Sequence, residues 1–226
     1  MARILLVDDD QSLLRALRIG LSARGYDVVE AHNGQEGITQ ASLATPDVVV
    51  LDLGLPDIDG VAVCRRIRGW SQVPIIVLSA AGSEDTKVAA LDNGADDYVT
   101  KPFGMAELEA RLRVALRRSP VSDNGADGPT ELSVGRIGID LVHHMATLDG
   151  APLDLTAREF DLLAFLARHA GKVCTQQMIL RQVWGPGYSS ESHYLRVYAH
   201  RLRRKLGDAG HLLHTQPGIG YQLREE

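Results

Sequence analysis

Several short apolar runs in the first half of the chain end in side chains that could carry phosphoryl chemistry. Three aspartates follow the run Ile4–Val7, and a fourth closes the run Val48–Asp52. Later runs end in a serine and a lysine. The set is Asp8, Asp9, Asp10, Asp52, Ser79 and Lys101. Carboxylates that converge repel one another and attract a hard divalent cation such as Mg²⁺.

With such an ion present, Asp52 could attack a phosphoryl group and become an acyl phosphate. Lys101 would then offset charge on the phosphoryl oxygens, and the Ser79 hydroxyl could donate a hydrogen bond to one of them. Two alternatives remain open at this point. Asp8–Asp10 could simply cap the first helix, where negative charge is favourable, and Lys101 could be a solvated surface lysine. Pro102 follows Lys101, and an X-Pro bond can be cis and so aim a side chain.

The elements that must position these residues alternate between strands and helices. Predicted strands are Ile4–Val7, Asp27–Ala31, Val48–Asp52, Ile75–Ser79 and Asp97–Thr100. Helical spacing of apolar residues recurs between them and again over 108–116. This alternation predicts a doubly wound, parallel (βα)5 α/β sheet. Because sites in such sheets form beyond the carboxyl ends of the strands, the predicted site residues should converge there.

The second half has a different pattern. Short strands are predicted at Arg136–Asp140, Met145–Asp149 and Pro152–Leu155. Three helices follow, starting near Thr156, Gln176 and Ser192, and a hairpin closes the chain. Three helices and a hairpin are the parts of an α+β winged helix-turn-helix domain.

The third of these helices, 192–206, has two contrasting faces. Advancing 100° per residue places Leu195, Ala199, Leu202 and Leu206 on one face. The opposite face and its flanks carry His193, Arg196, Val197, His200, Arg201, Arg203 and Arg204. An isolated helix of this kind is most often a solvated basic face, but the short helix before it and the hairpin after it favour insertion into the DNA major groove.

Length and composition set the outer limits. The 226 residues suit one or two domains, and the Pro-, Gly- and Ser-rich stretch 119–130 is typical of a linker. No apolar run approaches the ~20 residues of a membrane span. Two cysteines cannot build a disulfide framework. The net charge of −5 excludes a general polyanion binder but not a local basic surface. We therefore expect a cytoplasmic protein that does not enter membranes.

The first half resembles the receiver domain of two-component response regulators. The motifs are Val7-Asp8-Asp9-Asp10, Leu51–Gly60, Val77–Ala80 and Gly94–Phe103, within residues 1–118. The resemblance implies that Asp52 accepts a phosphoryl group from a sensor histidine kinase. It further implies that Asp8, Asp9, Asp52 and the Gly54 carbonyl bind Mg²⁺, that Ser79 is the switch hydroxyl, and that Tyr98 is the aromatic that turns inward with it.

The resemblance extends to the OmpR/PhoB subfamily, whose members form homodimers on phosphorylation through the fourth helix, fifth strand and fifth helix. The matching ion pairs between protomers would be Lys87 with Glu107, Asp97 with Arg111, and Asp96 with Arg118. Exposed pairs of this kind contribute at most ~1 kcal/mol each. They would therefore set register and partner choice more than affinity.

Residues 131–226 resemble the winged-helix effector of the same subfamily. The signatures are Leu155–Phe160, Val183–Gly185, Val197–Leu206 and Gly218–Tyr221. The resemblance implies that Thr156, Arg158 and Trp184 lie near the backbone of double-stranded promoter DNA. Thr215–Gln222 would form the wing beside the minor groove, where Thr215 would contact DNA. Many relatives carry an arginine two residues after the wing threonine, whereas this chain has Pro217 there. Further stretches, among them Gly69–Pro74 and Ser192–Arg196, resemble the branch of the family that controls potassium-transport operons.

Two other classes of protein fit these residues less well. A haloacid-dehalogenase-type phosphatase needs a second acid two residues after the nucleophile, and Gly54 occupies that position. A metal-binding or dimerisation module without phosphotransfer would leave Ser79 and the Lys101-Pro102 pair unexplained. Transfer of one phosphoryl group to the chain's own Asp52 is not turnover. The prediction is therefore a phosphorylation-dependent transcriptional regulator and not an enzyme.

Overall fold

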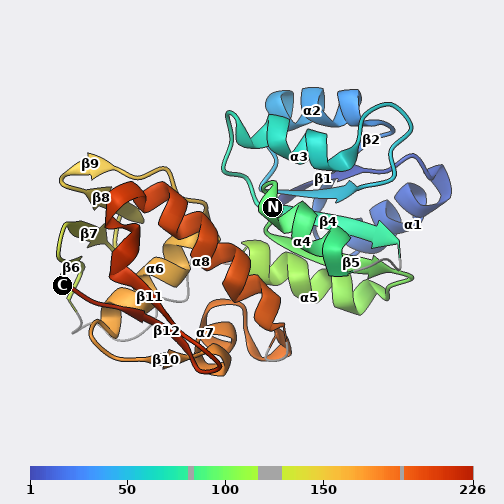
Figure 1. Cartoon of the computed structure of the whole chain (residues 1–226). Helices are drawn as coiled ribbons and strands as arrows, with labels where there is room; N and C mark the ends of the chain where they lie inside the picture. Colours follow the sequence, from blue (N-terminus) through green and yellow to red (C-terminus); the bar gives the residue numbers. More distant parts are fainter. Residues whose placement is uncertain (81–83, 117–128, 189–190, 226) are drawn as a thin grey trace. The chain divides into compact units, whose positions relative to one another are not determined.

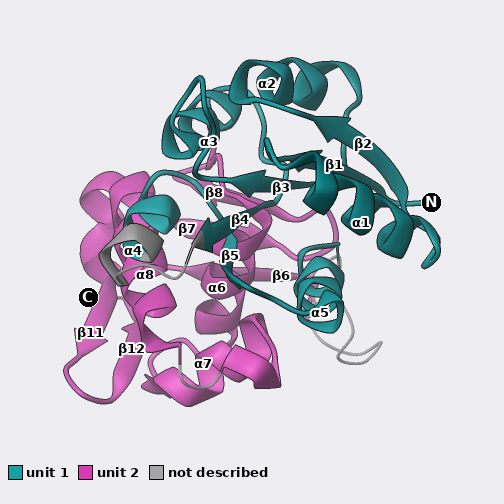
Figure 2. Cartoon of the chain, turned by 90° about the vertical axis from the view of Figure 1, so that its right-hand side faces the viewer, with its two compact units in different colours: residues 1–117 teal, residues 118–226 magenta. Residues whose placement is uncertain are grey.

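The computed structural model describes residues 1–80, 84–116, 129–188 and 191–225. The chain divides into two compact units, residues 1–117 and 118–226 (Figure 2). Each unit has its own sheet and its own buried core. Among the described helices, none is long and apolar enough to cross a membrane.

The first unit is the predicted α/β sheet. Its five strands run parallel in the order β2-β1-β3-β4-β5 (Figure 1). The strands are β1 (Arg3–Val7), β2 (Asp27–Ala31), β3 (Val48–Asp52), β4 (Ile75–Ala80) and β5 (Asp97–Lys101). The helices are α1 (Gln11–Ser22), α2 (Gly34–Leu43), α3 (Gly60–Arg68), α4 (Glu84–Asp92) and α5 (Met105–Leu116).

Helices cover both faces of this sheet, with α1 and α5 on one side and α2 and α3 on the other (Figure 2). Every residue of β3 is buried, as expected for a strand covered on both faces. Leu14, Leu17 and Leu21 of α1 pack with Leu108 and Leu112 of α5 against the sheet. This apolar layer fixes the strands whose carboxyl ends carry the predicted site residues.

The second unit begins with an antiparallel sheet in the order β6-β7-β8-β9. Its strands are β6 (Glu131–Val134), β7 (Ile137–Asp140), β8 (Met145–Leu148) and β9 (Ala151–Pro152). The sequence did not predict β6, because only one of its four side chains is buried. The predicted strand Pro152–Leu155 is wrong in its bounds, because β9 covers only Ala151 and Pro152.

The remainder of the second unit is the predicted winged helix-turn-helix. Its helices are α6 (Ala157–Arg168), α7 (Gln176–Val183), η2 (Pro186–Tyr188), α8 (Ser192–Leu206) and η3 (Gly207–Leu212). The closing hairpin pairs β11 (Leu213–Gln216) with β12 (Gly220–Leu223). A two-residue strand that the sequence did not reveal, β10 (Cys174–Thr175), adds to the outer side of β12.

Candidate functional site

The predicted acidic residues converge at the carboxyl edge of the parallel sheet. Asp8 and Asp9 follow β1, and Asp52 is the last residue of β3, the neighbouring strand. One carboxylate oxygen from each of the three lies within 4.8 Å of the others. Asp8 and Asp52 are buried, whereas Asp9 is exposed. Three carboxylates at this spacing offer the oxygen ligands that Mg²⁺ prefers, with one side open to water and substrate.

Lys101, the last residue of β5, completes the cluster. Its Nζ lies 2.7 Å from Oδ2 of Asp8 and 2.8 Å from Oδ1 of Asp52. The peptide bond from Lys101 to Pro102 is cis. One ammonium thus contacts both buried carboxylates, so Lys101 belongs to the cluster and is not a freely solvated lysine.

The electrostatics of the cluster follow from partial burial and mutual contact. Burial raises the pKa of the Asp8 carboxyl above its ordinary value, and the hydrogen bonds from Lys101 and from the Asp10 N–H offset this only in part. Burial alone would lower the pKa of Lys101, but its hydrogen bonds to Asp52 and Asp8 outweigh that effect and raise it. Lys101 therefore stays positively charged at neutral pH.

The loop after β3 is held closely around Asp52. The Gly54 N–H donates to Oδ2 of Asp52 over 3.0 Å. Where the loop enters α3, a Cβ on Gly60 would lie 2.5 Å from the Asp52 carbonyl oxygen and 2.6 Å from Leu53 Cα. Only glycine fits this close approach.

Asp57, in the middle of the same loop, anchors it to a neighbouring helix. Its carboxylate accepts the N–H groups of Gly34 and Gln35, at the start of α2, over 2.8 and 2.9 Å. These hydrogen bonds lower the pKa of Asp57. No sequence motif indicates this role of Asp57, because its partners lie 22 and 23 residues away in the sequence.

Asp10 is the helix cap that the alternative interpretation foresaw. Its side chain accepts from the N–H groups of Ser12 and Leu13 at the start of α1. Asp8 instead accepts from the Asp10 N–H over 2.9 Å and faces Lys101. The three consecutive aspartates therefore divide their roles: Asp10 caps the helix, and the other two join the acidic cluster.

The predicted switch residues lie on the two strands beside the cluster. Ser79 of β4 pairs in register with Thr100 of β5, next to Lys101, and is buried. Tyr98 is also largely buried, and the guanidinium carbon of Arg111 lies 5.8 Å from its ring centroid. The structure thus brings Ser79 to the predicted edge and places Tyr98 on the adjoining strand.

The residues predicted to join two protomers make contacts within one chain. Arg111 contacts Oδ1 of Asp97 over 2.9 Å and Oε1 of Glu107 over 3.2 Å. Arg118 lies outside the described residues, as does the side chain of Lys87 on α4.

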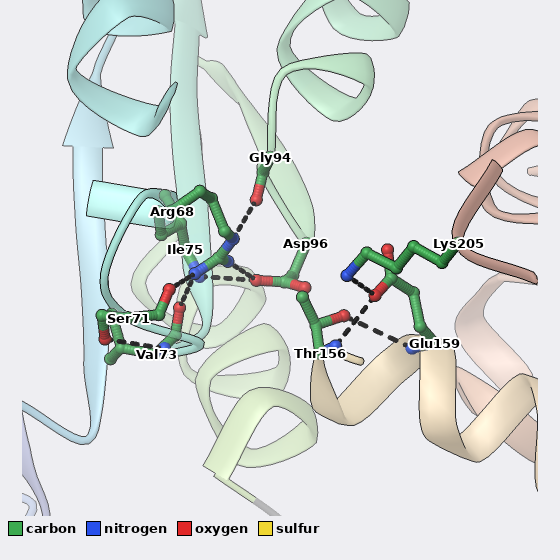
Figure 3. A network of polar contacts seen from close by, with 9 residues as sticks. All are labelled: Arg68, Ser71, Val73, Ile75, Gly94, Asp96, Thr156, Glu159 and Lys205. Carbon is green, nitrogen blue, oxygen red and sulfur yellow. Dashed lines mark hydrogen bonds and ion pairs between the residues drawn. The ribbon is translucent and has the colours of Figure 1, made fainter. Parts of the chain in front are cut away.

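Asp96 is buried in a polar network that the sequence did not reveal (Figure 3). Its carboxylate pairs with the Arg68 guanidinium and accepts from the Ile75 N–H over 2.9 Å. Arg68 also donates to the Gly94 carbonyl over 2.8 Å and to the Val73 carbonyl over 2.5 Å. Arg68 at the end of α3 thereby ties together the chain segments that lead into β4 and β5.

In the second unit, α8 has the two predicted faces. Leu195, Ala199, Leu202 and Leu206 are buried. Arg196, His200 and Arg204 are exposed and follow one another at four-residue spacing. Side chains spaced in this way form one continuous stripe along a helix, as major-groove insertion requires.

Other residues of the predicted DNA face have contacts inside the chain. Val197 and Arg201 are 4% and 5% exposed, and the Arg201 guanidinium carbon lies 5.1 Å from the ring centroid of Tyr198. His193 pairs with Glu191 at 3.5 Å and packs against the Tyr194 ring. Their contacts with DNA remain predictions.

Arg203 differs from the other arginines of α8 because it points to the hairpin. Its Nε and Nη2 donate to the Leu213 carbonyl over 2.9 and 2.7 Å, and Nη2 also donates to Oγ1 of Thr215 over 2.7 Å. Arg203 and Thr215 are both predicted DNA contacts. The structure joins them to each other.

The residues predicted near the DNA backbone also have contacts within the unit. Thr156 caps α6 in a reciprocal pair with Glu159, and Lys205 contacts Glu159 over 2.7 Å (Figure 3). Arg158 is buried and donates to the Val183 carbonyl over 2.8 Å. The DNA contacts of Thr156 and Arg158 stay predictions.

Trp184, at the end of α7, is packed between aromatic rings. Its ring centroid lies 5.8 Å from that of Tyr194 and 5.0 Å from that of Tyr198. Within the described part of the chain, the indole N–H has no hydrogen-bond partner. Trp184 therefore belongs to the aromatic core of the unit, where it is 1% exposed.

Comparison with known protein families supports this division of labour. Residues 4–113 match the model of the response regulator receiver domain, and residues 150–223 match that of the transcriptional regulatory protein, C terminal. Receiver domains bind Mg²⁺ at an acidic cluster, and the cluster described above lies within the matched residues.

Whole-chain relatives have the same two-part organisation. The chain is 47% identical to the transcriptional regulatory protein KdpE of Mycobacterium tuberculosis and to the KDP operon transcriptional regulatory protein KdpE of Escherichia coli. Each match covers 99% of both chains. Among solved structures, a RitR mutant covers 100% of both chains with a TM-score of 0.81 and 26% identity. The chain therefore belongs to the OmpR/PhoB-type response regulators, transcriptional regulators with a receiver domain followed by a winged-helix DNA-binding domain, and it is close in sequence to KdpE.

Proposed function

We propose that a sensor histidine kinase transfers a phosphoryl group to Asp52 of this chain and that phosphorylation promotes promoter binding. The observation that carries the proposal is the contact of Lys101 with both Asp8 and Asp52. Such a contact places a fixed positive charge where phosphoryl oxygens would gather around Asp52. We assign residues 1–118 to the receiver, 119–130 to the linker and 131–226 to the effector of a cytoplasmic protein.

Asp8, Asp9, Asp52 and the Gly54 carbonyl would hold Mg²⁺. The spacing of the three carboxylates supports this set. When bound, the ion would neutralise charge on the phosphoryl oxygens during transfer. A carboxylate oxygen of Asp52 attacks phosphorus while the phosphorus–nitrogen bond of the kinase phosphohistidine breaks. Lys101 stays protonated throughout and offsets charge on the phosphoryl oxygens.

The response to phosphorylation would pass through Ser79 and Tyr98 to the last part of the receiver. We propose that the Ser79 hydroxyl donates to the phosphoryl group and that Tyr98 turns inward with it. A homodimer would then form across α4, β5 and α5, with Lys87, Asp96, Asp97, Glu107, Arg111 and Arg118 as the interface charges. Arg111 contacts Asp97 and Glu107 of its own chain, so the proposed interface would require Arg111 to exchange these contacts for contacts with the other protomer.

The effector would read double-stranded promoter DNA with α8. Exposed Arg196, His200 and Arg204 support insertion into the major groove. We propose His193, Val197 and Arg201 as further DNA contacts, because helical geometry places them on the same side of α8 as these exposed residues. Thr156, Arg158, Trp184 and Thr215 are proposed backbone contacts, of which Thr215 is exposed.

The 47% sequence identity with KdpE, in matches that cover 99% of the chain, supports a more specific proposal about the regulated genes and the kinase. We propose that the regulated genes form a potassium-transport (Kdp) operon and that the partner kinase is KdpD-like. The chain would not turn over a substrate, since the phosphoryl group goes to its own aspartate.

Intact-mass measurement after incubation with acetyl phosphate and Mg²⁺ tests the receiver half of this proposal. We expect one labile phosphoryl adduct that disappears in Asp52→Asn and without Mg²⁺. Asp10→Asn is the matched control, because asparagine also caps helices well and Asp10 lies outside the cluster. An adduct that persists in Asp52→Asn, or sustained release of phosphate over many turnovers, would contradict the proposal.

Binding of promoter DNA tests the effector half. The phosphorylated chain should bind more tightly than the unmodified chain and protect two adjacent half-sites in a footprint. Equal affinities and equal footprints at every protein concentration would contradict dimerisation as the link between the two events.

A further inference from the structure

The wing is fixed to the body of the second unit along both of its strands. On one side, the Gln176 N–H at the start of α7 donates to the Ile219 carbonyl over 3.0 Å, and a Cβ on Gly220 would lie 2.0 Å from the Cys174 carbonyl oxygen. Strand β12 therefore lies against β10 with no space between them. On the other side, the three hydrogen bonds of Arg203 hold β11.

The backbone of Arg203 also sets the path of the chain into β11. A Cβ on Gly210, in the η3 segment that joins α8 to the hairpin, would lie 2.7 Å from the Arg203 carbonyl oxygen and 3.2 Å from its Cα. The connection thus runs directly over Arg203, while the side chain of the same residue binds the first and third residues of β11. One residue of α8 therefore fixes both the position and the direction of the hairpin.

The Thr215 hydroxyl can still donate a hydrogen bond while it accepts the one from Arg203. Oγ1 of Thr215 accepts from Nη2 of Arg203, and a hydroxyl that accepts one hydrogen bond still donates its own proton. Thr215 is exposed, as are Pro217 and Ile219 at the turn. Since Pro217 cannot extend a charged side chain toward DNA, a wing of this chain relies on a short hydroxyl that must be held at the right distance.

We infer that Arg203 is a positioning residue that holds the wing against the recognition helix and orients the Thr215 hydroxyl toward a DNA phosphate, rather than a phosphate contact itself. The inference deepens the proposed DNA binding and rests on it. It separates Arg203 from its neighbour Arg204, which is exposed and would contact DNA directly.

Replacement of each arginine by lysine distinguishes the two roles, because lysine keeps the charge but not the planar fork that reaches two acceptors. The probe is the duplex that the wild-type chain enriches from a random-sequence library, with sonicated genomic DNA as the non-specific duplex. We expect Arg203→Lys to weaken specific binding about tenfold and to remove hydroxyl-radical protection where the wing lies. Arg204→Lys should also weaken binding, but it should keep the protection where the wing lies, because the hydrogen bonds to β11 come from Arg203.

Thr215 variants test the other end of the contact. Thr215→Val should lose the same protection, Thr215→Ser should retain it, and the effects of Arg203→Lys and Thr215→Val should fall short of additive in the double variant. Neutral variants add a salt test: Arg204→Gln should reduce the slope of log affinity against log salt by about 0.9, and Arg203→Gln should reduce it less. Full protection where the wing lies in Arg203→Lys would overturn the inference, as would full protection in Thr215→Val.

Hydrogen exchange of the free chain separates this inference from the proposed function. Arg203→Lys should speed exchange of the β11 and β12 amide groups, whereas Arg204→Lys should not. If the wild-type chain enriches no duplex, the proposed function fails, and unchanged exchange in Arg203→Lys would still overturn the positioning role on its own.

Discussion

The Nζ of Lys101 lies 2.8 Å from Oδ1 of Asp52 and 2.7 Å from Oδ2 of Asp8, so one ammonium pairs with two carboxylates. A bound metal ion would interact with the same two carboxylates as Lys101, and a phosphoryl group on Asp52 would lie beside the ammonium. Its charge should oppose metal binding while it assists phosphoryl transfer.

Lys101→Ala separates these two effects. Loss of the ammonium leaves three carboxylates without a nearby cation, so we expect Mg²⁺ to bind severalfold more tightly, measured by calorimetry. Phosphorylation by acetyl phosphate should slow by at least about tenfold, because nothing then offsets charge on the phosphoryl oxygens. Lys101→Arg keeps the charge and is the control for the metal affinity. Weaker Mg²⁺ binding in Lys101→Ala would contradict the competition.

The pH dependence of Mg²⁺ binding should report Asp8. Burial raises the pKa of its carboxyl above the ordinary 3.8. Protons compete with the metal for the ionised carboxylate, so affinity should be greatest near neutral pH and fall on acidification, beginning above the range of an ordinary aspartate. Calorimetric titrations at several pH values measure this. Asp8→Asn should bind Mg²⁺ weakly and show a flatter profile; a wild-type affinity that stays constant down to pH 3.8 would contradict the prediction.

Arg68→Ala should destabilise the receiver strongly. It leaves the Asp96 carboxylate buried without its cation, and removal of one partner from a buried pair costs about 3–5 kcal/mol. Urea unfolding followed by Trp70 fluorescence, in a Trp184→Phe background, measures the loss. Arg65→Ala on the same helix is the control, because its contact with Asn93 is exposed and should contribute less than about 1 kcal/mol. Equal losses in the two variants would show that the network of Arg68 does not stabilise the fold.

Gly60→Ala should disturb the loop around Asp52. The added methyl group would meet the backbone of Asp52 and Leu53, which cannot move aside as a flexible side chain would. We expect a loss of about 1–3 kcal/mol in unfolding free energy and slower phosphorylation. Gly104→Ala is the matched control, since nothing lies within 4 Å of its added Cβ. A normal phosphorylation rate in Gly60→Ala would show that the loop adapts.

The parallel sheet could be predicted because its strands are continuous apolar runs, and the site could be predicted from the sheet. Asp8, Asp52 and Lys101 are far apart in the sequence, but each ends a strand or follows one, and parallel strands end at one edge. Strands β6 and β10 escaped prediction because one buries a single side chain and the other has two residues.

The partners of charged side chains were harder to predict than their positions. Helical spacing placed Arg203 at the side of α8, but the carbonyl that it binds belongs to Leu213, ten residues later, beyond a turn whose path depends on Gly210. Arg68 and Asp96 are 28 residues apart and meet only once β4 and β5 pair. No spacing rule links such residues before the tertiary structure exists.

The charge count of the acidic edge has a consequence for the lifetime of the signal. Three carboxylates and one ammonium sum to −2, so a single divalent ion brings the edge to neutrality. Phosphorylation of Asp52 to the acyl phosphate replaces one negative charge by the roughly two of a phosphoryl group, so the net charge of the modified edge with its divalent ion is about −1. We therefore expect contacts made elsewhere, such as those between two protomers or with a promoter, to prolong the phosphorylated form.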